Sequence, residues 1–124
     1  METRVKPQHV DYWRRRRSER QAQNRQLAQQ ARADLEQIVD VLVRQFGAIR
    51  IILFGSLARG RFAPDSDIDL AVEGIAPEHY FAALAAINRL TRRWVDLKPL
   101  EDLDPHFRQR VLATGECVYA RDVA

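Results

Sequence analysis

Residues 51–72 read IILFGSLARGRFAPDSDIDLAV, and this stretch decides both the fold and the chemistry that we expect. The apolar, β-branched residues 49–54 predict a buried strand, which ends at the small-residue turn Gly55-Ser56. A second strand is predicted over residues 67–73, where acidic and apolar residues alternate before the pattern becomes apolar on both faces. The stretch therefore predicts two strands joined by a loop that opens with a tight turn.

Asp67 and Asp69 are the residues of the second strand that indicate chemistry. Residues i and i+2 of a strand point to the same face, so the two carboxylates should project side by side. Such close carboxylates resist joint ionisation unless a cation lies between them, and Mg²⁺ is a hard cation that prefers oxygen ligands. In the preceding turn, Ser56 is expected to cap the helix that follows and to offer its hydroxyl to a phosphate. Metal and phosphate together indicate nucleotide chemistry.

Each of these features has a plainer explanation when it is taken alone. Gly-Ser is a common strand-to-helix turn, and two acids at alternate positions also fit an edge strand with one solvated face. The combination favours the site: Gly55-Ser56 is followed, after ten residues, by acid–apolar–acid, with strands on both sides. We therefore prefer the metal and phosphate interpretation to an ordinary turn and edge strand.

A third carboxylate lies in the strand predicted over residues 93–100. Asp96 interrupts an otherwise apolar strand interior. It could also face solvent, or form an ion pair with Arg93 or Lys98. Given the other two acids, we favour a role for Asp96 in the metal site.

The rest of the chain predicts an α+β fold, a mixed β-sheet with packed helices and a long basic N-terminal helix. The apolar stripe and the absence of Gly and Pro predict a helix over about residues 10–46, with Gly47 as its C-terminal cap. Further helices are expected from Pro77 to about Thr91 and from Asp104-Pro105 to Gly115, followed by a strand over residues 116–120. Three more side chains are expected in the core: Trp94, Cys117 and Tyr119.

Composition places the charge in one part of the chain. The 124 residues fit one folded domain with a net charge of +3, and they contain no apolar run long enough to cross a bilayer. A single cysteine cannot form an internal disulfide, which fits a reducing cytoplasm. Residues 1–33 hold nine Lys/Arg against three Asp/Glu, and residues 34–124 hold eleven against fourteen. We therefore separate a basic, helical N-terminal arm (1–33) from a folded domain (34–124). The arm could bind nucleic acid, dock on an acidic partner, self-associate or stay solvated.

The spacing of the key residues resembles that of a known superfamily. Gly55-Ser56, the gap, Asp67-x-Asp69 and the later apolar–Asp96–apolar strand resemble DNA polymerase β-type nucleotidyltransferases. Within that superfamily these sequence motifs are most similar to those of the minimal nucleotidyltransferases, small bacterial proteins often paired with HEPN-domain toxins. The resemblance begins at about residue 39, so it does not extend to the basic arm.

The resemblance implies a metal site built from three acids. Asp67 and Asp69 would bridge two Mg²⁺ ions, one on the triphosphate and one that lowers the pKa of the attacking hydroxyl. Asp96 would complete the second metal site and help to accept the proton. Gly55 and Ser56 would hold the β- and γ-phosphates of ATP.

The resemblance also implies an activity and a partner. The protein would transfer AMP from ATP to a tyrosine of a HEPN-type toxin and would thereby act as an antitoxin. Arg59, which lies just past the turn, is either a phosphate ligand or a structural salt-bridge residue. Two alternatives remain: an antitoxin that neutralises its partner by binding alone, and, less favoured, a nucleic-acid-binding module that uses the arginine-rich helix.

Overall fold

The computed structural model describes residues 7–121. Its first element is the long helix α1 (Pro7–Arg44), which confirms the predicted N-terminal helix and begins three residues earlier than expected. Three residues after the helix ends at Arg44, the chain turns at Gly47, which has a φ of 74°. The Gly47 and Ala48 N–H groups donate to the carbonyl oxygens of Val43 (3.2 Å) and Leu42 (3.0 Å), and the first of these is the bond of an αL cap. The predicted role of Gly47 is therefore confirmed.

Within residues 7–121, four strands form one mixed sheet, and the sequence predicted a mixed sheet. The sheet has the order β3-β2-β1-β4, in which β1 is antiparallel to both of its neighbours and β2 is parallel to β3. Every predicted strand is present, each within two residues of the expected bounds. The strands are β1 (Arg50–Phe54), β2 (Ile68–Glu73), β3 (Val95–Pro99) and β4 (Glu116–Ala120).

The remaining helices connect these strands. The Asp104 carboxylate accepts hydrogen bonds from the N–H groups of His106 and Phe107, which confirms the predicted N-cap. One helix ends at Asn88, before the expected Thr91, and the next two N–H groups donate to carbonyl oxygens three residues back. At this end the Asn88 side chain bonds both the N–H and the C=O of Val95 in β3. The connecting elements are α2 (Gly55–Ala58), the 3₁₀ turn η1 (Pro77–His79), α3 (Tyr80–Asn88), the 3₁₀ turn η2 (Leu100–Asp102) and α4 (Pro105–Thr114).

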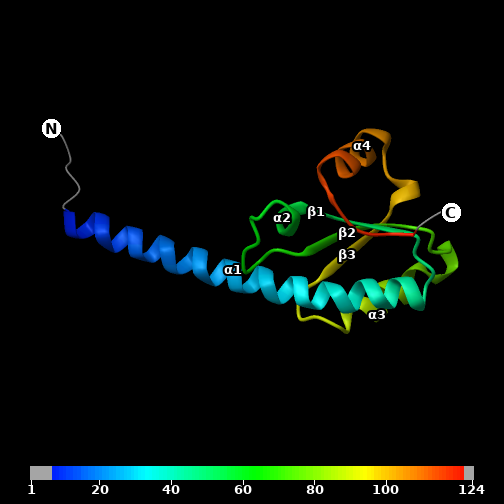
Figure 1. Cartoon of the computed structure of the whole chain (residues 1–124), viewed down its shortest axis with the longest axis horizontal. Helices are drawn as coiled ribbons and strands as arrows, with labels where there is room; N and C mark the ends of the chain where they lie inside the picture. The colour runs from blue at the N-terminus through cyan, green and yellow to red at the C-terminus, as the bar shows by residue number, and fades with distance from the viewer. Residues whose placement is uncertain (1–6, 122–124) are drawn as a thin grey trace.

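The sheet separates two apolar layers. Figure 1 shows α1 and α3 on one face of the sheet and α4 on the other. In β2, Ile68, Leu70 and Val72 point into the larger core with α1 and α3, whereas Ala71 points into the smaller core beneath α4. Each large apolar side chain that is fully buried in this way contributes about 1.5–3 kcal/mol to the free energy of unfolding. By the same alternation, Asp69 lies on the face that α4 partly covers.

Two of the three core predictions are wrong. Cys117 is exposed because its apolar run forms β4, which has a neighbouring strand on one side only. The Trp94 side chain is 54% exposed, although its carbonyl oxygen accepts a hydrogen bond from the Ile68 N–H at 3.0 Å. Tyr119 is partly buried and packs against the larger core, as predicted.

The first half of α1 extends beyond the sheet, away from the folded body (Figure 1). Residues 11–23 are all exposed, and contact with the larger core begins at Leu27 and Ala28. Ala31 is already buried, at 2% exposure. No helix in the part of the chain that the structure describes is long and apolar enough to cross a membrane.

Candidate functional site

The strand register brings two of the three predicted acids together. In the parallel pair β2–β3, Asp69 lies directly opposite Asp96. Residues that are opposite each other in neighbouring strands share a face, so both carboxylates lie on the face of the sheet that carries α4. Asp67 lies one residue before β2 and is exposed. The site therefore consists of two adjacent half-buried carboxylates with a third at the entrance to β2.

Gly55 lies directly against one of these carboxylates. Phe54, the last residue of β1, pairs with Asp69, and the chain then turns at Gly55 with a φ of +76°. A β-carbon added at Gly55 would lie 2.2 Å from Oδ2 of Asp69, closer than any real contact. Glycine is therefore required at this position for two reasons: the left-handed backbone and the close approach of the Asp69 carboxylate.

The electrostatics of the site are those of crowded negative charge. Burial raises the pKa of Asp69, and the neighbouring charges of Asp96 and Asp67 raise it further, against the opposing effect of Lys98. Two like charges in a partly desolvated place disfavour joint ionisation. A bound cation would relieve this repulsion, which is the physical reason to consider a metal here.

The Lys98 ammonium lies next to the Asp96 carboxylate, where a metal ion bound to Asp96 would also have to lie. Its Nζ lies 2.9 Å from Oδ2 of Asp96, and this hydrogen bond raises the pKa of the Lys98 ammonium. The ion pair between these residues is the alternative that the sequence left open for Asp96. Lys98 is also a site residue that the sequence reasoning did not select, although its i+2 spacing from Asp96 could have indicated it.

The donor atoms suit magnesium, although they are not gathered into a finished metal site. All three acids offer carboxylate oxygens, the ligands that Mg²⁺ prefers. Within residues 7–121, no group of three or more His, Cys, Asp or Glu side chains is arranged around a single point as a metal site would be. Because Lys98 holds Asp96, metal binding would require Asp96 to exchange this ammonium for the cation.

The turn after β1 differs in one detail from the expectation. Ser56 does not cap the following helix, because α2 begins at Gly55 and its N-cap residue is Phe54. Ser56 is instead the second residue of α2, half-buried and close to the glycine turn. Arg59 is exposed at the C-terminal end of α2, and no carboxylate among the described residues forms a salt bridge with it. The structural salt bridge considered for Arg59 is thus absent from this part of the chain.

Arg93 holds the loop that leads to Asp67. Its guanidinium donates to the carbonyl oxygens of Ala63 (3.3 Å), Pro64 and Ser66 (3.5 Å). It also lies over the buried Phe62 ring, 5.1 Å from the ring centroid. The sequence reasoning considered Arg93 only as a partner for Asp96, because contacts across 27 to 30 residues leave no local pattern in the sequence.

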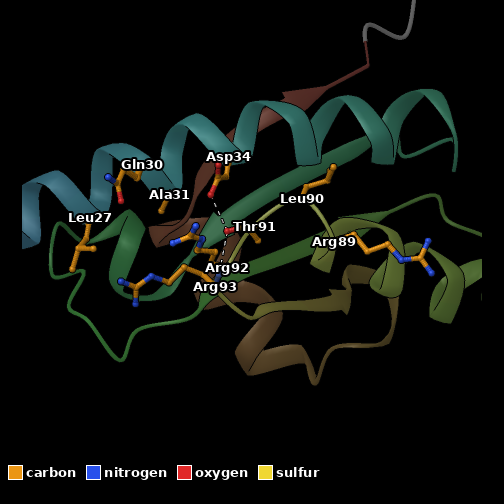
Figure 2. A pocket seen from close by; sticks show the side chains of 9 residues that line it. All are labelled: Leu27, Gln30, Ala31, Asp34, Arg89, Leu90, Thr91, Arg92 and Arg93. Carbon is orange, nitrogen blue, oxygen red and sulfur yellow. Dashed lines mark hydrogen bonds between the residues drawn. The ribbon is translucent and has the colours of Figure 1, made fainter.

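A cleft of about 650 Å³ lies beside this loop, between α1 and the segment that joins α3 to β3. Figure 2 shows the Thr91 hydroxyl pointing toward Asp34, to which it donates at 2.8 Å. None of the six predicted site residues lines this cleft, so it is separate from the acids. Its lining residues are Leu27, Gln30, Ala31, Asp34, Arg89, Leu90, Thr91, Arg92 and Arg93.

Solved structures share this arrangement of strands and helices. A structure assigned as a minimal nucleotidyltransferase is 30% identical, with a TM-score of 0.63, and the match covers 72% of this chain and 93% of that one. A toxin–antitoxin complex with AMP-PNP is 24% identical, with a TM-score of 0.61 and coverage of 70% and 74%. The Shewanella oneidensis complex of a tri-AMPylated HEPN toxin with its MNT antitoxin is 20% identical, with a TM-score of 0.58 and coverage of 72% and 71%. The last two likenesses show the fold alone.

The family comparison covers most of the folded part of the chain. The model of the family described as "Polymerase beta, Nucleotidyltransferase" matches residues 36–124. No curated protein matches the chain in sequence. The matched range includes the glycine turn and all three acids, and it excludes the projecting half of α1. The chain therefore belongs to the polymerase beta nucleotidyltransferase family and is of the minimal nucleotidyltransferase type.

Proposed function

We propose that this nucleotidyltransferase moves AMP from ATP to a hydroxyl group of a HEPN-type toxin, in a Mg²⁺-dependent reaction that silences the toxin. The observation that carries the proposal is the pairing of Asp69 with Asp96 on one face of the sheet, with the backbone of Gly55 against Asp69. This arrangement offers adjacent carboxylates for a cation and a close-approach turn for a phosphate.

In this proposal the acids hold the metal. Asp67 and Asp69 would each donate a carboxylate oxygen, and Asp96 would join them once Lys98 releases it. When bound, Mg²⁺ neutralises phosphate oxygens and lowers the pKa of the attacking hydroxyl. The raised pKa of Asp69 supports this assignment, because the same crowding that disfavours its ionisation favours a bound cation.

The turn and the residues after it would bind the triphosphate. The backbone at Gly55 can approach the β- and γ-phosphates because it carries no side chain, and Ser56 can donate its hydroxyl. Arg59 is exposed and unoccupied by any carboxylate of the described chain, so its guanidinium is available to the leaving phosphates. The α-phosphorus would remain open to attack.

The transfer itself exchanges one phosphorus–oxygen bond for another. The acceptor hydroxyl oxygen forms a bond to the α-phosphorus, and the bond from that phosphorus to the oxygen bridging to the β-phosphate breaks. Pyrophosphate leaves with the electron pair, and the hydroxyl proton passes to the Asp96 carboxylate. Such catalysis depends mainly on positioning and on stabilising the developing charge.

The openness of the site fits a protein as the acceptor. Asp67 is exposed, and the Asp96 side chain retains 37% of its accessible surface. A loop or tail of another protein can therefore reach the acids without entering a deep cavity. The toxin–antitoxin complexes with AMP-PNP and with a tri-AMPylated HEPN toxin support this choice of nucleotide and partner.

A labelling experiment tests the proposal. The protein is incubated with ATP labelled at the α-phosphate, Mg²⁺ and the HEPN-type partner, and label is then sought on the partner. We expect labelling by the wild-type protein and its loss in Asp67→Asn and in Asp69→Asn, since each change removes a metal ligand but keeps the side-chain shape.

Asp65→Asn is the matched control because Asp65 lies in the same loop and is exposed. It should label the partner as the wild-type protein does. Labelling that survives Asp69→Asn would contradict the catalytic assignment. Neutralisation of the toxin without any transfer of label would instead support the antitoxin that acts by binding alone.

A further inference from the structure

We propose that the projecting segment, residues 7–26 of α1, binds double-stranded DNA by lying in its major groove. This inference does not depend on the proposed transfer reaction. It concerns a part of the chain outside the matched family range, which starts at residue 36.

The projecting segment is exposed and strongly basic. It carries six arginines and only two acids, Asp11 and Glu19. All six arginines are exposed, and none forms a salt bridge with a carboxylate of the described residues. Figure 1 shows the segment extending away from the sheet, so a long ligand can approach it from several sides. The six are Arg14, Arg15, Arg16, Arg17, Arg20 and Arg25.

The distribution of the arginines around the helix favours a groove over a flat surface. Consecutive residues of an α-helix are separated by about 100°, so Arg14 to Arg17 span roughly 300° of the circumference. A protein that docks on one face of the helix would leave half of these charges in solvent. A groove places phosphates on both sides of the helix, where guanidinium groups on opposite faces can all be used.

The width of the helix favours duplex DNA over duplex RNA. A helix with its side chains is about 10–12 Å across, which matches the major groove of B-form DNA at about 12 Å. The major groove of duplex RNA is too narrow to admit side chains. Twenty residues at 1.5 Å each give roughly 30 Å of helix, close to one turn of B-form DNA.

One stripe of the segment has the chemistry to contact base edges. Arg17, Gln21 and Asn24 follow at i, i+4 and i+7, so they share a face of the helix. Guanidinium groups pair with guanine and side-chain amides pair with adenine in the major groove. Two exposed aromatic side chains, Tyr12 and Trp13, stand beside the arginines with their rings 5.5 Å apart.

A second copy of the chain is a poorer occupant of this surface. Pairing two projecting segments side by side would bring like charges together along their length, which is destabilising at moderate salt. The same charges are an advantage against a polyanion, because binding releases the counterions that surround it.

Binding to a labelled mixed-sequence DNA duplex of about 30 base pairs, roughly 100 Å long, tests the inference by fluorescence anisotropy. The full chain is compared with a variant that carries Arg14→Gln, Arg15→Gln, Arg16→Gln and Arg17→Gln. Between about 50 and 200 mM salt we expect steep weakening for the wild-type protein. The variant should bind at least about tenfold more weakly, with a salt slope smaller by roughly 3 to 4.

Two further variants keep the test specific. Replacing the same four arginines by lysine preserves the charge and should preserve most of the affinity and the salt slope. Removing four exposed arginines of the folded body changes the net charge equally and should leave DNA binding nearly unchanged. That control carries Arg89→Gln, Arg92→Gln, Arg110→Gln and Arg121→Gln.

The chain also offers a local reporter of binding. Trp94 is the only other tryptophan, so Trp94→Phe leaves Trp13 as a single fluorophore within the projecting segment. Its emission should change on adding DNA. Equal or tighter binding to duplex RNA, or equal losses in the body control and the arginine-to-glutamine variant, would overturn the inference. So would unchanged DNA binding by the arginine-to-glutamine variant.

Discussion

The backbone turn at Gly55 allows a sharp prediction for a single residue. Gly55→Ala would place a β-carbon 2.2 Å from Oδ2 and 3.1 Å from Cγ of Asp69, so the carboxylate must move. A displacement of about 1 Å in a catalytic group can reduce the rate by roughly 100-fold. We expect a loss of this size in the labelling of the partner, together with destabilisation of at least about 1–2 kcal/mol from the left-handed backbone.

Gly47→Ala is the control that separates strain from collision. Gly47 has a nearly identical φ of 74°, and nothing lies within 4 Å of the position of an added β-carbon. The Gly47→Ala variant should lose about 1–2 kcal/mol of stability in denaturant unfolding, as Gly55→Ala does from its backbone, while it keeps its labelling activity. Equal activity of the two variants would show that Gly55 does not position Asp69.

Arg93 is a second residue whose effect should reach the acids indirectly. Arg93→Ala removes the hydrogen bonds to the carbonyls of residues 63–66 and the contact over Phe62. Hydrogen bonds from a charged donor contribute about 1.5–3 kcal/mol, so we expect a loss of stability near the lower end of this range. We also expect faster amide exchange at Ser66 and Ile68, whose N–H groups donate to the carbonyl oxygens of Ala63 and Trp94. Hydrogen exchange read by NMR measures this directly. The exposed neighbour variant Arg92→Ala should leave both amides protected as in the wild-type protein; equal loosening by both variants would contradict the role of Arg93.

At the scale of elements, one ion pair fastens α1 to the edge strand β4. Arg32 donates to both carboxylate oxygens of Glu116, at 2.9 and 3.0 Å, and this hydrogen bonding lowers the pKa of Glu116. A lowered pKa in the folded state stabilises the protein above the ordinary glutamate pKa, about 4.3, and the stabilisation is lost as pH falls through the folded value. Both side chains are more than 40% exposed, so the contribution at neutral pH is below about 1 kcal/mol.

The melting temperature measured from neutral to acidic pH tests this contact. Glu116→Gln should melt below the wild-type protein at neutral pH, and the difference should shrink as the solution is acidified. Glu36→Gln, an exposed glutamate on α1 that forms no salt bridge within the described chain, should show no such trend. A constant difference across the pH range would show that the pair does not act through ionisation.

The elements that the sequence predicted well are those governed by local patterns. The apolar stripe of α1, the glycine at its end and the Asp104-Pro105 start of α4 are all encoded within one or two turns of chain. Burial was predicted less well, because exposure of Cys117 and Trp94 depends on which strand lies at the edge and where β3 begins. Strand order is a property of the sheet and is not written in the strand itself.

At the scale of the whole molecule, the sequence indicated three acids as candidate site residues but did not predict what surrounds them. The spacing of Asp67, Asp69 and Asp96 resembled a known family, and the parallel register of β2 and β3 explains how distant acids become neighbours. The pairing of Lys98 with Asp96 and the hold of Arg93 on its loop are tertiary contacts. The i+2 spacing within a strand can indicate the pairing of Lys98 with Asp96, whereas the contacts of Arg93 with the loop can be seen only in the folded chain.

The whole site should respond to its ligands in the stability of the molecule. Repulsion among the acids destabilises the fold when Asp69 is ionised, so Asp69→Asn should raise the melting temperature without metal. Mg²⁺ should raise the melting temperature of the wild-type protein, and ATP with Mg²⁺ should raise it further. A ligand present at 100 times its dissociation constant adds about 2.7 kcal/mol to the free energy of unfolding. Calorimetry should show that Asp69→Asn loses both ligand effects while Asp65→Asn keeps them. A wild-type protein that is indifferent to Mg²⁺ and to ATP would contradict a metal site at these acids, whatever the fold.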